Sequence, residues 1–227
     1  MTHHPGHQSL PSDFLQLDPA AAARVCLLAT ATARAAQSWA DKHGVATPDI
    51  ASPIAMSMAF AAPWRHADEL AVANRIVHWV FWLDDVTETA DSDAAVADLA
   101  ERCRAVATGE APEWHDSTTL ALADIHRMLV TRPLWPALAT RWQDAVTRTV
   151  LSFGQDRVFA RDLAAGNPPA PSEYLQRTLG AELCWISHLI AAEGSDVLAH
   201  IPVLLAALEP GDWARPCLLY TSDAADE

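Results

Sequence analysis

Helix start and stop residues recur along the whole chain, and this feature constrains the fold more than any other. Asp18 is followed by Pro19, by a long stretch rich in Ala and Leu, and then by Gly44. An acidic N-cap, a proline in the first turn and a glycine after the last turn predict one helix between Asp18 and Gly44. Similar punctuation, including caps at Ser92 or Asp93 and at Asp116, predicts further helices at about residues 53–62, 68–88, 93–109, 116–131, 134–165, 172–191 and 196–208.

Strand signals are nearly absent from the sequence. Alternating runs of Val, Ile and Thr between Asn-Gly or Asp-Gly turns do not occur, whereas Ala, Leu, Arg and Glu fill the periodic segments. The connections between the expected helices are short, and no repeat of solenoid length is present. The sequence therefore predicts an all-α fold, an antiparallel helical bundle, with one domain over residues 18–216 and a disordered N-terminal segment over residues 1–17.

Composition and charge exclude several classes of partner. The 227 residues carry a formal net charge of −14, and basic residues never cluster beyond a pair. A polyanion would find no run of positive charge to bind, so we expect no nucleic-acid partner. No apolar run reaches the roughly 18 to 20 residues needed to cross a bilayer, so we also expect no membrane span and a cytoplasmic location.

The last eleven residues have an unusual character. Residues 217–227, Cys-Leu-Leu-Tyr-Thr-Ser-Asp-Ala-Ala-Asp-Glu, look like the translation of a sequencing adaptor. We therefore expect them to be a non-native tail, with the natural sequence diverging after about Pro216. The alternative is a genuine C-terminal tail. On the first interpretation the helical bundle is incomplete at its C-terminus.

The most informative motif is the acidic end of the apolar segment 78–88. Asp84, Asp85 and Glu88 stand at the C-terminal end of the expected helix, where the helix dipole favours basic residues instead. Their spacing places the three carboxylates on adjoining faces, where two unit charges repel by about 3 kcal/mol at an effective dielectric constant near 20. A divalent cation would compensate this repulsion, and oxygen ligands on one turn suit Mg²⁺. The alternative interpretation is a solvated acidic helix end.

The order of motifs around these acids resembles that of bacterial class I terpene synthases. Trp-x-Phe-x-Leu-Asp-Asp-x-x-Glu at residues 79–88 is followed by matching segments at residues 102–109, 121–125 and 171–175, and the resemblance covers residues 20–210. It implies the class I terpenoid synthase type of helical bundle. It also implies that Asp84, Asp85 and Glu88 bind Mg²⁺, which holds the diphosphate of a prenyl substrate. The second metal motif of that family, Asn-Asp-x-x-Ser-x-x-x-Glu, does not occur in the sequence.

The chemistry that the resemblance implies is ionisation and cyclisation of a linear prenyl diphosphate, a lyase reaction that releases diphosphate. Aromatic faces would stabilise the carbocation while the cavity excludes water. Phe81 shares a helical face with Asp85 and Glu88, which makes it the first candidate for the cavity wall, with Trp82 second. Both could equally be ordinary core residues.

Arg177 stands where the same family places its diphosphate-sensing arginine. Its planar guanidinium suits bidentate binding of phosphate oxygens. Gly180 follows it by three residues, whereas the family's effector residue usually follows by four, and a solvated or ion-paired arginine is the alternative.

Two other functions stay open at the level of the sequence. One is a prenyl-chain-elongating synthase, although that family has basic residues beside its motif and this chain has Val86 and Thr87. The other is a non-catalytic helical binding or scaffold protein. With the second metal motif missing, we expect the chain as written to be inactive. The substrate length and the oligomeric state, including a homodimer, are left open.

Overall fold

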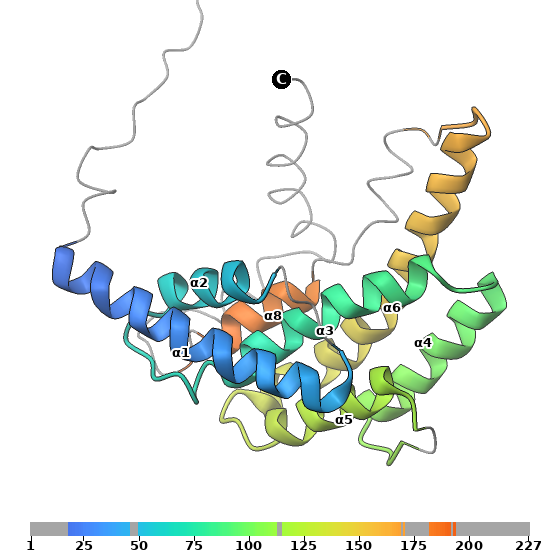
Figure 1. Cartoon of the computed structure of the whole chain (residues 1–227). Coiled ribbons are helices and arrows are strands. Elements are labelled where there is room, and N and C mark those ends of the chain that lie inside the picture. Colours follow the sequence, from blue (N-terminus) through green and yellow to red (C-terminus); the bar gives the residue numbers. More distant parts are fainter. Residues whose placement is uncertain are drawn as a thin grey trace, which may run out of the picture.

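The structure of the chain is a computed structural model that describes residues 18–45, 50–112, 115–168, 170, 182–191 and 193. Within these residues it contains seven helices and no strand, which confirms the predicted all-α fold (Figure 1). Arg177 and the tail over residues 217–227 lie outside the described residues, as do residues 1–17 and the helix expected over residues 196–208. The helices are α1 (Pro19–His43), α2 (Ala51–Ala61), α3 (Ala71–Glu88), α4 (Asp93–Ala107), α5 (Ser117–Leu129), α6 (Trp135–Ala164) and α8 (Glu182–Ala191).

Three helices begin at the caps that the sequence predicts. The Asp18 carboxylate accepts a hydrogen bond from the Ala21 amide at 3.2 Å, and the Ser92 hydroxyl and the Asp116 carboxylate accept equivalent bonds at the starts of α4 and α5. Gly44 ends α1 with φ of 67°, a left-handed conformation that favours glycine. Local cap chemistry therefore sets these boundaries.

The start of α3 differs from the prediction by three residues. A helix was expected from about Asp68, but it begins at Ala71, after a turn that Glu69 stabilises. The Glu69 carboxylate accepts from the His66 amide and from the Arg65 guanidinium, each at 2.8 Å. These bonds stabilise a non-helical turn over residues 66–70, so the helix cannot start earlier.

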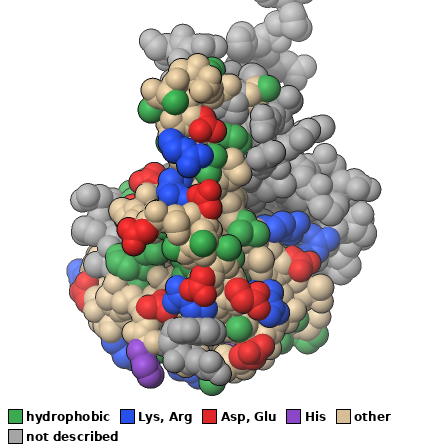
Figure 2. Space-filling model, turned by 90° about the vertical axis from the view of Figure 1, so that its right-hand side faces the viewer, with side chains coloured by type: hydrophobic (Ala, Val, Ile, Leu, Met, Phe, Trp, Pro, Cys, Tyr) green, Lys and Arg blue, Asp and Glu red, His purple; other side chains and the backbone are tan. Residues whose placement is uncertain are grey.

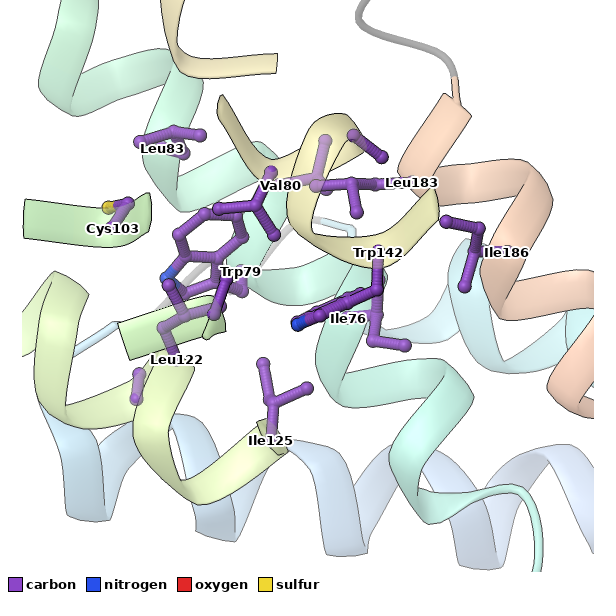
Figure 3. Close-up of a cluster of buried hydrophobic side chains, with 14 of the residues drawn as sticks. Ile76, Trp79, Val80, Leu83, Cys103, Leu122, Ile125, Trp142, Leu183 and Ile186 are labelled. Atoms are coloured by element: carbon purple, nitrogen blue, oxygen red, sulfur yellow. The ribbon is translucent and has the colours of Figure 1, made fainter. Parts of the chain in front are cut away.

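Helix α3 lies at the centre of the bundle, because it packs against α1, α2, α5, α6 and α8. Its side chains Ile76, Trp79, Val80 and Leu83 are buried in the main apolar core, where they meet residues of α4, α5, α6 and α8 (Figure 3). The Trp79 indole donates to the Thr118 backbone carbonyl of α5 at 2.9 Å, which satisfies its polar atom inside the core. The core thus fixes the position of α3 along most of its length.

A buried carboxylate joins α1, α3 and α5. Asp124 of α5 accepts from the Trp39 indole at 2.8 Å and from the Arg75 guanidinium at 3.1 Å, and it pairs with Arg127 at 3.0 Å. Desolvation opposes its charge, but these donors outweigh it and lower the pKa of Asp124 below its ordinary value. This network therefore uses a buried charge to position three helices.

Helix α6 is the longest described helix, and its C-terminal end projects beyond its neighbours. On the face that carries α4 and this part of α6, acidic and basic side chains are interspersed, with no extended basic patch (Figure 2). None of the helices within the described ranges combines the length and the apolar character that a membrane crossing requires.

Candidate functional site

The candidate site lies at the C-terminal end of α3. Asp84, Asp85 and Glu88 occupy its last two turns, as the sequence predicts, and no basic residue lies in the last turn. Asp84 is half-buried, whereas Asp85 and Glu88 are exposed. The Thr87 and Thr89 hydroxyls donate to the Asp84 and Asp85 carbonyls, each at 2.9 Å, so local threonines satisfy the helix end. These neutral hydroxyl groups bring no positive charge to offset the helix dipole at this end.

Burial and repulsion act together on Asp84. Its partial burial raises the pKa of this carboxyl group above its ordinary value, and the nearby Glu88 and Asp85 charges raise it further. Both causes disfavour the charged form, so a carboxylate at this position lowers the free energy of unfolding. Such a perturbed carboxylate in a group of like charges is typical of a functional site.

A further acid, Asp156 of α6, faces this end of α3. Burial raises its pKa to about 6, and the charges of Asp84 and Glu88 contribute to the shift. Its carboxylate oxygen Oδ1 is shielded from solvent and has no hydrogen-bond partner among the described residues. The acids of α3 and Asp156 of α6 therefore form one electrostatic group contributed by two helices.

Sequence reasoning missed Asp156, although the sequence contains a signal for it. Trp142, Val146, Thr149 and Phe153 follow one another at helical spacing along α6, and all four are buried or partly buried. Asp156 continues this stripe three residues later, where an apolar side chain would be expected. An acid in the inward-facing stripe of a helix is the pattern that would have indicated a second source of carboxylates.

Arg157 helps to hold α6 in register with the end of α3. Its guanidinium donates to the Ala90 carbonyl at 3.1 Å and forms an ion pair with Asp93, the first residue of α4. The loop between α3 and α4 is thereby tied to the residue next to Asp156. The position of Asp156 opposite the acidic motif is thus supported by a specific contact.

The carboxylates of this group have no compensating charge within the described chain. Asp84, Asp85, Glu88 and Asp156 form no ion pair with an arginine, lysine or histidine of those residues. Anywhere among the described residues, no three His, Cys, Asp or Glu side chains lie close enough together to hold a metal ion by themselves. The donor set still fits Mg²⁺, which usually takes one or two protein carboxylates and completes its shell with water and phosphate oxygens.

The two aromatic candidates differ in their surroundings. Phe81 is 42% exposed, and it lies on the same side of α3 as the exposed Asp85 and Glu88. Trp82 is half-buried against the core, and its indole donates to the Thr118 hydroxyl of α5 at 3.1 Å. Phe81 is therefore available to a ligand at this end of α3, whereas Trp82 contributes to packing between α3 and α5.

No protein-family model matches the sequence, and no curated protein matches it at a significant level.

Proposed function

We propose that the chain is a class I terpene synthase whose acidic site binds Mg²⁺ together with a prenyl diphosphate; with the family's second metal motif also present, such a site would ionise and cyclise the substrate with release of diphosphate. One observation carries the proposal: carboxylates of two packed helices, which form no ion pair among the described residues, lie close enough at the C-terminal end of α3 for their charges to raise the pKa values of Asp84 and Asp156. The resemblance of the aromatic and acidic motif supports the same class. Magnesium, when bound there, would neutralise the charge of the diphosphate leaving group.

Different residues of the chain would bind the cation, the hydrocarbon part of the substrate and the diphosphate. Asp84, Asp85 and Glu88 would hold the cation, and Asp156 would add negative charge from the opposite side. Phe81 would present an aromatic face to the hydrocarbon part of the substrate, where the negative face of the ring favours developing positive charge. Arg177, which lies outside the described residues, would bind the diphosphate oxygens.

Binding is the primary test, because the sequence lacks the family's second metal motif. Mn²⁺ is used as a paramagnetic substitute for Mg²⁺, and its binding to the whole chain is measured by electron paramagnetic resonance with and without inorganic diphosphate. We expect binding that diphosphate strengthens and that Asp84→Asn weakens at least about tenfold, because a carboxylate ligand and its charge are lost. Asp144→Asn is the matched control, since Asp144 is exposed on α6.

Turnover is the second readout. Prenyl diphosphates of ten, fifteen and twenty carbons are incubated with Mg²⁺, and hydrocarbon products are identified by gas chromatography with mass spectrometry. Any product should disappear in Asp84→Asn and Asp85→Asn while the folded structure persists. Equal Mn²⁺ binding in the native chain and in both variants would contradict the metal assignment and favour a non-catalytic helical protein.

A further inference from the structure

A second surface feature, far along the sequence from the acidic motif, is an apolar groove between α1 and α2. It has a volume of about 370 Å³ and is lined by Ala21, Arg24, Val25, Phe60, Pro63 and Trp64. Phe60 and Trp64 are 49% and 50% exposed, so two large aromatic side chains that line the same groove are open to solvent. Figure 1 shows α2 lying along α1, and the lining residues Ala21, Arg24 and Val25 place the groove beside the first turns of α1.

We propose that residues 10–17 of this chain bind in the groove between α1 and α2. The path of the chain supports this occupant. Residue 17 is joined directly to Asp18, the N-cap of α1, and Ala21 in the groove wall is only one helical turn further on. Eight extended residues span up to about 26 Å, so the segment reaches across the groove without leaving the start of α1.

The chemistry of the segment matches that of the groove. Residues 10–17 read Leu-Pro-Ser-Asp-Phe-Leu-Gln-Leu, so they offer four large apolar side chains and one charge. Asp13 is the single charged side chain among residues 1–17, counting Asp, Glu, Lys and Arg. The groove contributes one charge of opposite sign, Arg24, which has no ion-pair partner within the described residues. An apolar segment with one acid therefore meets an apolar groove with one base.

The tether favours this segment over other occupants. A covalently linked segment a few residues away has an effective concentration in the millimolar range, about a thousand times that of a second copy at micromolar concentration. Binding needs no helix or strand within residues 10–17, because apolar contact and one ion pair supply the recognition.

Limited proteolysis of the whole chain by chymotrypsin tests the proposal. The enzyme cleaves after Phe14, Leu15 and Leu17, and a bound segment is protected at these bonds. We expect Phe60→Ser and Trp64→Ser each to raise the cleavage rate about fivefold or more, because each removes apolar surface from the groove. Leu151→Ser is the matched control: Leu151 is 48% exposed but lies on α6, outside the groove, and should leave the rate unchanged.

A charge exchange tests the pairing of Asp13 with Arg24. Asp13→Arg and Arg24→Asp should each raise the cleavage rate, and the double variant should restore protection. Equal cleavage rates in the native chain and both groove variants would overturn the proposal. Protection that increases with protein concentration would also overturn it, because that result identifies a second copy as the occupant.

Discussion

Asp156 holds its proton more strongly than an ordinary carboxyl group, and this has a measurable effect on stability. Its pKa is raised to about 6 in the folded chain, against about 3.9 in an unfolded one. Above pH 6 the folded protein therefore carries an unfavourable charge that the unfolded chain solvates freely.

We expect Asp156→Asn to increase the free energy of unfolding at pH 7 by about 1 kcal/mol, a value reduced by solvent screening of a half-exposed group. Urea denaturation at pH 7 and pH 4 measures the effect. The gain should disappear toward pH 4, where Asp156 is protonated in the folded state. Asp144→Asn, on the exposed side of the same helix, should produce no gain at either pH. A loss of stability at pH 7 would show that Asp156 has a structural partner.

The sequence indicates the acids of α3 but not their partner on α6, for a physical reason. Positions 84, 85 and 88 are neighbours within one helix, so their spacing alone brings them together. Asp156 meets them only because α3 and α6 pack in one particular register, which local spacing does not encode. The helical phase of Phe81 relative to Asp85 and Glu88 made it the first candidate for the cavity wall but left an ordinary core position open. The hydrogen bond of Trp82 to Thr118 depends on packing with α5.

At the level of the helices, the contact between α4 and α6 depends on a residue without a side chain. A Cβ atom built on Gly154 would lie 2.5 Å from the Val96 Cγ1 atom of α4. Alanine normally stabilises a helix interior relative to glycine by roughly 0.5–1 kcal/mol. Here the cost of the clash should exceed the gain in helix stability, because overpacking a core costs about 1–3 kcal/mol.

We therefore expect Gly154→Ala to lower the free energy of unfolding by about 1–2 kcal/mol, measured by urea denaturation. The double variant Gly154→Ala with Val96→Ala should lose less unfolding free energy than the sum of the losses in the two single variants, since the second substitution removes the atom that clashes. A stabilising Gly154→Ala, or additive effects in the double variant, would mean that α4 and α6 separate easily at this contact.

Helix boundaries were predictable where caps are local and less so elsewhere. Asp18, Ser92 and Asp116 each bond an amide three residues ahead, so the sequence determines these starts. The start of α3 was wrong by three residues because the Glu69 side chain stabilises a turn, and an acid in that position reads equally well as part of a helix.

For the whole molecule, one buried and two partly buried histidines contribute to the response to pH. The pKa values of His43, His78 and His126 all lie below the ordinary value of about 6.5, with desolvation as the largest cause. The unfolded chain therefore binds more protons than the folded chain as the pH falls through 6.5. By linkage, stability decreases on acidification from about pH 7 to pH 5.

The raised pKa values of Asp84 and Asp156 act in the opposite direction over part of this range. The histidine effect should consequently be clearest in Asp156→Asn, whose free energy of unfolding is measured by urea denaturation at half-unit steps of pH. We expect the free energy of unfolding of this variant to decrease steadily toward pH 5, because unfolding takes up protons. Constant stability over this range in the variant would contradict the assignment of neutral, buried histidines.

The central position of α3 makes this helix an internal reference for amide hydrogen exchange. Five helices pack against it, while the side chains of Asp85 and Glu88 in its last turn are exposed. Amides of residues 76–83 should exchange only when the whole protein unfolds, whereas those of residues 86–89 should exchange through local opening. A ligand bound at the acidic end should slow exchange there and leave the buried turns unchanged, so mass spectrometry of one peptide, residues 71–90, reports occupancy and global stability separately. Equal protection along this peptide without any ligand would contradict this description of α3.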